Sequence, residues 1–370
     1  MSFPPCPQPP DWSIDWTTLD TFPWIRDLKG CPQNPGRHAE GDVWAHVHMV
    51  CEAMAALPAW RELPEHERQL LFSAALLHDV AKPACTRVES DGSVTSRGHS
   101  WRGAVRGRQI LWRRGLPFAL REQVTALIRH HLVPFFLADS ENPVRMAVEV
   151  SQTVRCDWLG ILAESDARGR ICPDPDHLLG QIEQFRARCR ELNCFDRPYP
   201  FPSDHARFLF FRDQNRPPDA AADEDFKAEV TLMSGLPGAG KDFWIRRNLP
   251  GGTVVGLDAL RVEMGVAPSD PQGVVLSKAR ELAREHLRQL HSFVWNATNL
   301  SRHVRNECVR LFADHGAKVR IVYVEVPPDR LFAQNRMRRR KVPESVIERL
   351  LDRWEVPDRT EAHQVDWVVG

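Results

Sequence analysis

A glycine-rich segment at positions 235–242, GLPGAGKD, carries residue types that bind phosphate. It matches the phosphate-binding loop pattern GxxxxGK[ST] except at its last position, where Asp242 replaces the hydroxyl that usually holds Mg²⁺. Lys241 supplies a positive charge for a transferred phosphoryl group. Four small residues are expected to turn backbone N–H groups toward phosphate oxygens: Gly235, Gly238, Ala239 and Gly240. We expect Asp242 to hold Mg²⁺ through a water or slightly farther out; alternatively, it only complements the helix dipole.

Two further groups in this half of the chain suit phosphoryl transfer. Asp258, at the end of the next expected strand, is placed to accept a proton from an attacking hydroxyl, and Arg261 to grip a neighbouring phosphate. The alternative is that Asp258 only caps its helix. The basic run 334–346, QNRMRRRKVPESV, suggests a lid whose Arg336 and Arg338 close on a triphosphate, although such runs are often solvated helix faces.

The first half of the chain contains spaced histidines and aspartates on expected helices. Imidazoles and carboxylates from different helices can converge in a bundle core, with Asp79 bridging two divalent metals. The candidate ligands are His46, His78, Asp79, His99, His130 or His131, and Asp166. The following Leu-Val-Pro favours His131 over His130. Candidate phosphate contacts are Lys82, Arg102, Arg170 and His38, with Lys82 also a candidate catalytic group.

Composition is that of an ordinary water-soluble protein. The 370 residues are 42% hydrophobic and 26% charged, with no apolar run long enough to span a membrane and no signal-peptide pattern, so the cytoplasm is the expected location. Nine cysteines without a CxxC pair suggest reduced thiols. The net charge is zero, but the part from Lys227 onward has 23 Lys and Arg against 18 Asp and Glu, which makes it the better candidate for binding a phosphate polymer.

The hydrophobic pattern changes along the chain. Apolar residues recur at helical spacing over 41–168, which predicts an all-α domain, whereas from Ala228 short apolar runs alternate with helical segments, which predicts a parallel sheet covered by helices. A segment rich in Pro and Asp lies between them. We therefore expect an all-α domain at 1–195, a linker at 196–226 and an α/β P-loop domain at 227–370.

These motifs resemble two known families. GLPGAGKD, Asp258 with Arg261, and the arginines before Val342-Pro343 resemble the kinase domain of phage-type polynucleotide 5′-kinases, which have serine at the position of Asp242. The histidine and aspartate series resembles that of HD-type metallohydrolases. Both halves in this order resemble the bacterial bifunctional end-healing enzymes that join an HD phosphoesterase to a polynucleotide kinase.

The resemblance implies two activities on nucleic-acid ends. One is a 2′,3′-phosphoesterase that uses two divalent transition metals such as Mn²⁺, Ni²⁺ or Co²⁺. The other is a 5′-hydroxyl kinase that uses ATP or another NTP with Mg²⁺. RNA or DNA ends would be the partners, with a ligase acting on the products and no membrane. Two alternatives remain: a fusion of an HD nucleotidase with a small-molecule kinase, and a non-catalytic nucleotide sensor.

Overall fold

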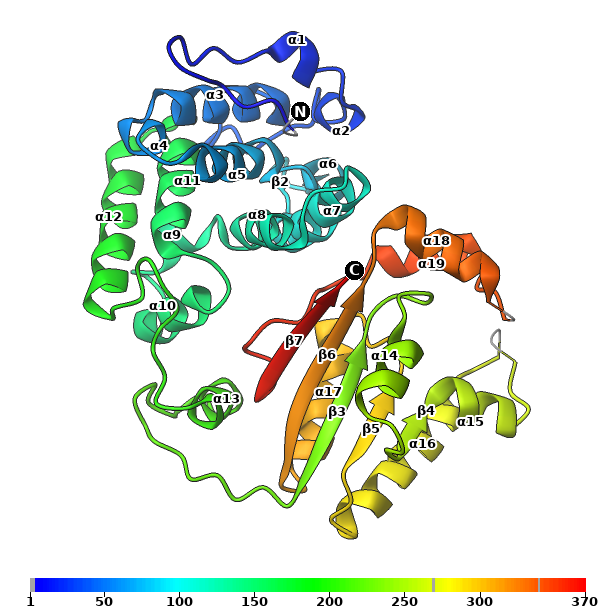
Figure 1. Cartoon of the computed structure of the whole chain (residues 1–370). Coiled ribbons are helices and arrows are strands. Elements are labelled where there is room, and N and C mark those ends of the chain that lie inside the picture. Colours follow the sequence, from blue (N-terminus) through cyan, green and yellow to red (C-terminus); the bar gives the residue numbers. More distant parts are fainter. Residues whose placement is uncertain (1–3, 268–269, 339) are drawn as a thin grey trace. The chain divides into compact units, whose positions relative to one another are not determined.

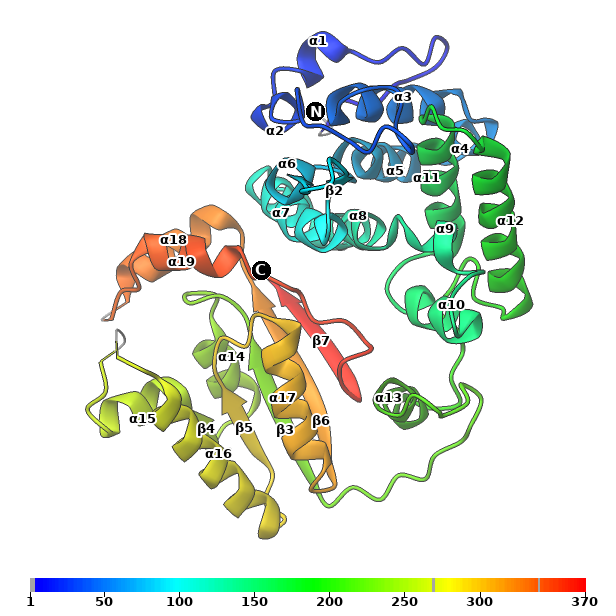
Figure 2. The ribbon, with the colours of Figure 1, turned by 180° about the vertical axis from the view of Figure 1, so that it is seen from behind.

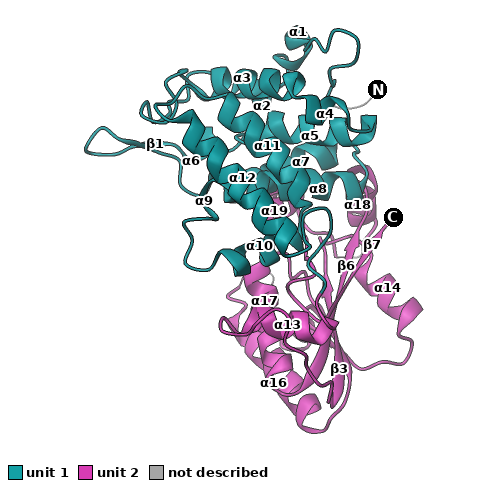
Figure 3. Cartoon of the chain, turned by 90° about the vertical axis from the view of Figure 1, so that its left-hand side faces the viewer, with its two compact units in different colours: residues 1–200 teal, residues 201–370 magenta. Residues whose placement is uncertain are grey.

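The chain forms two compact units, residues 1–200 and 201–370 (Figure 3). The computed structural model describes residues 4–267, 270–338 and 340–370. No helix in these described ranges is long and apolar enough to cross a membrane. All nine cysteines are free thiols, and seven are buried.

From residue 4 onward, where the structure describes it, unit 1 is helical apart from one small hairpin (Figure 1). Its helices are α1 Trp16–Leu19, α2 Pro23–Arg26, α3 Val43–Ala56, α4 Pro58–Arg61, α5 Glu65–Leu77, α6 Lys82–Cys85, α7 His99–Arg113, α8 Phe118–His130, α9 Val133–Phe136, α10 Pro143–Ser151, α11 Cys156–Arg168 and α12 Pro175–Glu191. The antiparallel strands β1 Arg87–Val88 and β2 Val94–Thr95 interrupt the helices, so the expectation of a purely helical domain needs this correction. The turn residues Asp91-Gly92 between the strands account for the hairpin, because Gly92 has a φ of +81°.

The helices of unit 1 pack around one large apolar core to which α3, α5, α7, α8 and α11 all contribute. Polar residues lie at the ends of some of these helices. The side chain of Asp42 accepts a hydrogen bond from the Ala45 N–H and caps α3. Helix α5 ends at Leu77, so that His78 and Asp79 lie in the tight turn that follows it. The core thus fixes the positions of helix ends that carry polar side chains.

Unit 2 is an α/β domain with a five-stranded parallel sheet in the order β4-β5-β3-β6-β7. Its elements are α13 Asp204–Arg212, β3 Ala228–Ser234, α14 Lys241–Asn248, β4 Val254–Gly256, α15 Leu257–Glu263, α16 Gly273–Arg288, β5 Phe293–Asn296, α17 Arg302–Ala313, β6 Ala317–Glu325, α18 Pro328–Met337, α19 Glu344–Leu351 and β7 Gln364–Val369. Helices α14 and α17 lie on opposite faces of the sheet (Figures 1 and 2). The central strands are buried runs of branched and aromatic side chains, as a sheet covered on both faces requires.

Two parts of unit 2 were not expected from the sequence. Strand β7 pairs in parallel with β6 at the edge of the sheet, and its mixture of polar and apolar residues hid it from a search for apolar runs. Helix α13 lies inside the expected linker 196–226. It belongs with unit 2, because Phe208 packs in the core of that unit and Arg207 donates hydrogen bonds to the carbonyl oxygens of Arg359 and His363.

Candidate active sites

Five packed helices of unit 1 bring the histidines and aspartates together. The members are His46 in α3, His78 and Asp79 directly after α5, His99 at the start of α7, His131 directly after α8, and Asp166 in α11. All are buried except His99, whose side chain is 13% exposed. Residues more than a hundred positions apart thus form one cluster.

The four histidine rings of this cluster share one arrangement, in which Nδ1 donates a hydrogen bond to a fixed oxygen. His46 donates to Glu40 Oε1 at 2.9 Å, His78 to the Ala75 carbonyl at 2.7 Å, His99 to the Ser96 carbonyl at 2.7 Å and His131 to the Ile128 carbonyl at 2.7 Å. In a neutral ring whose Nδ1 carries the proton, Nε2 carries the lone pair. When all four rings are neutral, as binding of a cation requires, four Nε2 atoms are therefore available as ligands.

The Nε2 atoms meet in pairs. His46 and His78 approach to 3.4 Å through these atoms, and so do His99 and His131 at 3.4 Å. Two lone pairs cannot hydrogen-bond to each other, so a cation near each pair fits the donor set. Neutral imidazole nitrogens oriented by a hydrogen bond at the other ring nitrogen are the usual arrangement of metal-binding histidines.

Asp79 lies between the two pairs. Its Oδ2 is 3.2 Å from His78 Nε2 and 3.7 Å from His46 Nε2, whereas Oδ1 is 3.5 Å from His99 Nε2. Oδ1 is buried and has no hydrogen-bond partner in the described part of the chain. The residues form two potential cation-binding groups that share this carboxylate, one with His46 and His78 and the other with His99 and His131. Such a donor set suits two divalent metals.

Positive side chains surround these carboxylates. Lys82 Nζ lies 2.7 Å from Asp79 Oδ2 and donates to Gln33 Oε1 at 2.7 Å. Burial by itself would raise the pKa of Asp79, but Lys82 and His78 outweigh burial and hold this pKa well below its usual value. Arg170 donates to both oxygens of Asp166, at 2.9 and 2.5 Å. The side chains of Lys82 and Arg170, which the sequence suggested as phosphate contacts, thus lie beside the cluster.

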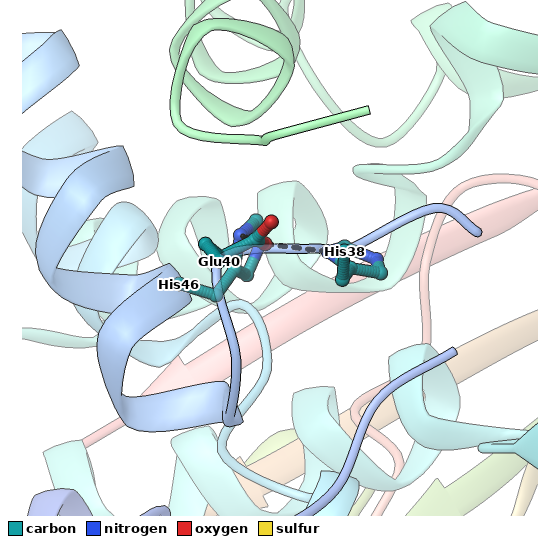
Figure 4. A group of neighbouring side chains, drawn as sticks. All are labelled: His38, Glu40 and His46. Atoms are coloured by element: carbon teal, nitrogen blue, oxygen red, sulfur yellow. Dashed lines mark hydrogen bonds and ion pairs between the residues drawn. The ribbon is translucent and has the colours of Figure 1, made fainter. Parts of the chain in front are cut away.

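A third carboxylate, Glu40, adjoins the cluster and was missed in the sequence (Figure 4). Its Oε1 accepts from His38 Nδ1 at 2.8 Å and from His46 Nδ1 at 2.9 Å, while Oε2 accepts from the Ile171 N–H at 2.9 Å. Burial lowers the pKa of His38 to about 4, so His38 is neutral near pH 7. A glutamate six residues before His46 carries no recognisable spacing signal, which explains the omission.

Two of the residues predicted for this site, His130 and Arg102, lie outside the histidine and aspartate groups that could hold a cation in the described part of the chain. His130 points away from the cluster, since its Nε2 contacts Thr153 Oγ1 at 3.0 Å; of the two adjacent histidines, the structure brings His131 to the other ligands. His130 is therefore withdrawn as a candidate ligand. Arg102 is exposed one turn after His99, and its guanidinium donates a long hydrogen bond of 3.4 Å to the Ala84 carbonyl.

In unit 2, the glycine-rich loop joins β3 to α14 at the carboxyl end of the sheet. Gly235 has a φ of +141°, and a Cβ there would lie 2.3 Å from the Val324 carbonyl oxygen of β6. Only glycine fits at this position, because the loop leaves the sheet against the neighbouring strand. Gly238 and Gly240 also have positive φ values, of +87° and +104°, and Gly240 caps α14. The loop thus has the backbone that a phosphate cradle requires.

Lys241 is the first residue of α14. Its Nζ donates to the carbonyl oxygens of Gly235 and Leu236 at 2.8 and 3.1 Å, so that the ammonium group lies over the loop. Burial lowers the pKa of Lys241 to about 8. A positive charge held at this point is placed to meet phosphate oxygens.

The exposed carboxylate of Asp242 contacts a residue that was not singled out in the sequence. Asn296, the last residue of β5, donates from Nδ2 to Asp242 Oδ1 at 2.7 Å. Strand β5 pairs directly with β3, so Asn296 ends the strand adjacent to the loop. The apolar run that contains it was recognised as a strand, but its terminal amide was not recognised as part of the site.

Asp258 and the expected lid lie at the same end of the domain. Asp258 is in the first turn of α15, its side chain is 77% exposed, and it forms an ion pair with Arg261 at 2.5 Å. Arg261 is held in addition by Gln272 Oε1 at 2.7 Å. Arg338 Nη2 lies 4.0 Å from Asp258 Oδ2, whereas Arg336 pairs with Glu344 at 3.3 Å. Of the two lid arginines, Arg338 is the one beside the expected base.

Comparison with known proteins identifies part of the chain. A family model described as an AAA domain matches residues 230–357. The multifunctional CCA protein of Halorhodospira halophila is 34% identical over 111 residues, which cover 30% of this chain and only 24% of that protein. A crystal structure of a sugar kinase from Janibacter sp. HTCC2649 covers 38% of this chain and 85% of its own, with 16% identity and a TM-score of 0.29. With the loop and sheet described above, the family match makes unit 2 a P-loop, nucleotide-binding domain.

Proposed function

We propose that this protein repairs nucleic-acid ends with two active sites. Unit 1 would be a metal-dependent phosphoesterase that removes 2′,3′-cyclic, 2′- or 3′-phosphates, and unit 2 an NTP-dependent kinase that phosphorylates 5′-hydroxyl ends. Two independent sets of residues in one chain carry the proposal. One is the two histidine groups that share Asp79. The other is the loop with Lys241, together with Asp258 and its neighbour Arg338.

In unit 1 the ligand set would hold two divalent cations. Bound there, these cations would neutralise phosphate charge and activate water for attack on phosphorus. The four histidines present Nε2, Asp79 contributes to both groups, and Asp166 lies 3.2 Å from His46 Nε2. Lys82 adds positive charge next to Asp79, where a phosphate bound to the cations would lie. His38, neutral near pH 7, can contact that phosphate only by hydrogen bonding.

In unit 2 the loop amides and Lys241 would hold the phosphates of ATP or another NTP, with Mg²⁺ near Asp242. Asp258 would accept the proton of the attacking 5′-hydroxyl as the hydroxyl oxygen bonds to the γ-phosphorus, while the bond from this phosphorus to the β–γ bridging oxygen breaks and the nucleoside diphosphate leaves. Arg261, fixed by Asp258 and Gln272, would bind the phosphate next to that hydroxyl. Arg338 would close on the triphosphate and offset the charge that develops during transfer.

One assay tests both activities. The purified protein is incubated with γ-labelled ATP, a divalent metal and an oligonucleotide that carries a 5′-hydroxyl and a 2′,3′-cyclic phosphate, and both ends are analysed. We expect label at the 5′ end and loss of phosphate at the 3′ end, giving ends suited to a ligase. RNA and DNA versions of the oligonucleotide establish which polymer is preferred.

Free nucleosides and nucleotides serve as competing substrates in the same assay. If they are phosphorylated or hydrolysed well while the oligonucleotide is not, the protein belongs to small-molecule nucleotide metabolism. If neither kind of substrate turns over with any metal tested, the chain is a nucleotide sensor and both proposed activities are wrong.

A further inference from the structure

The contact between Asp242 and Asn296 joins two positions that matter in any P-loop nucleotide site. Asp242 follows the loop lysine, and Asn296 ends β5, the strand that pairs with β3 in parallel (Figure 1). In P-loop NTPases, Mg²⁺ is held by a serine or threonine hydroxyl at the first position and by an aspartate from a strand close to the loop. Here the carboxylate is on the loop, and a neutral amide ends the adjacent strand.

From this geometry we infer that the two Mg²⁺-holding roles are exchanged in this protein. Asp242 supplies the carboxylate from the first turn of α14, and Asn296 is a positioning residue that orients it through the 2.7 Å bond to Oδ1. Of these two positions, one still carries a carboxylate, as in the usual arrangement. Here it is the position after the loop lysine and not the end of the adjacent strand. The inference rests on nucleotide binding by unit 2 and not on which acceptor is phosphorylated.

The contacts of the two residues support a role toward a cation. Asp242 Oδ2 has no hydrogen-bond or ion-pair partner among the described residues, so one carboxylate oxygen is available. A group that serves only the helix dipole needs no partner from a neighbouring strand. A hydrogen bond that fixes a carboxylate oxygen is the usual support of a metal ligand, and Mg²⁺ tolerates little deviation from its preferred geometry.

The exchange is tested by swapping the two side chains. The swap itself compares four proteins: the wild type, Asp242→Asn, Asn296→Asp, and the double variant with both changes. Asn296→Ala and a control variant are measured beside them. Binding of ADP is titrated without metal and with Mn²⁺, and Mn²⁺ binding is also followed by electron paramagnetic resonance. The ratio of the two ADP affinities isolates what the metal contributes, and metal-free binding reports an intact loop.

We expect Asp242→Asn to lower the metal-dependent gain in ADP affinity by about tenfold or more. The double variant should recover most of this gain, because it has a carboxylate at the end of β5, where P-loop NTPases usually have one. Asn296→Ala should lower the gain by about tenfold, since a supporting hydrogen bond of a metal ligand is lost. Asn248→Asp, which adds a carboxylate to the exposed face of the same helix, is the matched control and should leave the gain unchanged.

A double variant as weak as Asp242→Asn would overturn the exchange, and so would equal gains in all four proteins. Metal-free ADP binding and melting temperature identify any variant that is merely unfolded. For such a variant, Asp242→Ser with Asn296→Asp supplies the same swap with a smaller loop side chain. Since no phosphate acceptor is present, a protein that fails to phosphorylate 5′-hydroxyl ends still gives a decisive result.

Discussion

Glu40 occupies a position from which it can orient His46, one of the proposed metal ligands. Its Oε1 accepts from both His38 and His46, and these hydrogen bonds hold the pKa of Glu40 far below its usual value although burial acts in the opposite direction. A carboxylate bonded to Nδ1 fixes the ring and makes Nε2 a stronger ligand.

We expect Glu40→Gln to lower the affinity of unit 1 for divalent metal by about 10–100-fold, because the amide keeps the shape of the side chain but not its charge. Titration of metal-free protein with Co²⁺, followed by visible absorption, measures the change. Glu52→Gln, an exposed change on the same helix as His46, is the control. Equal affinities for wild type and Glu40→Gln would mean that Glu40 has no part in metal binding.

The side chain of Asp258 is 77% exposed, as the proposed role of a general base facing an incoming substrate requires. We expect Asp258→Asn to reduce the turnover of a 5′-hydroxyl oligonucleotide by about 10²-fold or more while ATP affinity stays unchanged, because the amide retains the shape of the side chain but cannot accept the proton. Steady-state kinetics separate the two quantities. Glu263→Gln on the same helix is the control. Near-normal turnover of Asp258→Asn would show that Asp258 only caps α15.

At the residue level, the sequence predicted most members of both candidate sites because the side chains that do chemistry are distinctive. It could not choose firmly between His130 and His131, since that depends on how α8 ends. It missed Glu40 and Asn296, because common residues acquire a role only through their neighbours in space.

At the level of elements, α13 is attached to unit 2 through an aromatic cluster. The ring of Phe208 stacks on that of His363 with centroids 3.8 Å apart, and His205 lies 5.2 Å from His363. His363 Nδ1 accepts a hydrogen bond from the Val319 N–H at 3.0 Å, so this nitrogen must be unprotonated. Burial and the neighbouring His205, Lys318 and Arg212 lower the pKa of His363 to about 3.

This lowered pKa predicts loss of stability in acid. Between the ordinary histidine value near 6.5 and about 3, the unfolded chain binds a proton at His363 that the folded chain excludes. The free energy of unfolding should therefore fall by up to about 1.4 kcal/mol per pH unit below pH ~6.5 from this residue alone. Urea unfolding at pH 7, 6 and 5 measures the slope.

We expect His363→Asn to flatten this slope, because the amide oxygen can accept from Val319 N–H and does not titrate. The variant starts from a lower stability at pH 7, since the stacked ring is lost, so the slope is the quantity to compare. His315→Asn replaces an exposed histidine of the same unit and serves as control. An unchanged slope in His363→Asn would assign the acid sensitivity to other groups.

Most strands and helices of unit 2 could be predicted from the sequence, since buried parallel strands are continuous apolar runs. The edge strand β7 was not, because it mixes Gln364 and Asp366 with apolar residues, as a loop would. Helix α13 was hidden by the prolines and aspartates on both sides of it. Its assignment to unit 2 depends on contacts with residues about 150 positions later, which no local pattern reports.

At the level of the whole molecule, the two candidate sites lie in units with separate apolar cores. The core of unit 1 is built from residues 19–194, and that of unit 2 from residues 208–365. The site in unit 1 is made entirely of residues from unit 1, and the loop, base and lid all belong to unit 2. Each proposed chemistry can thus be removed without changing the residues proposed for the other.

We therefore expect the two activities to separate by mutation. Asp79→Ala removes the carboxylate common to both cation groups and should abolish phosphate removal at the 3′ end while 5′ phosphorylation continues. Lys241→Ala removes the charge above the loop and should do the reverse. The two activities are measured on one oligonucleotide that carries a 5′-hydroxyl and a 2′,3′-cyclic phosphate. Circular dichroism establishes that each variant is folded. His303→Ala, an exposed histidine of α17 far along the chain from either motif, should retain both activities. Loss of both activities in either folded variant would mean that the chemistries depend on a shared site, and the two-site proposal would then be wrong.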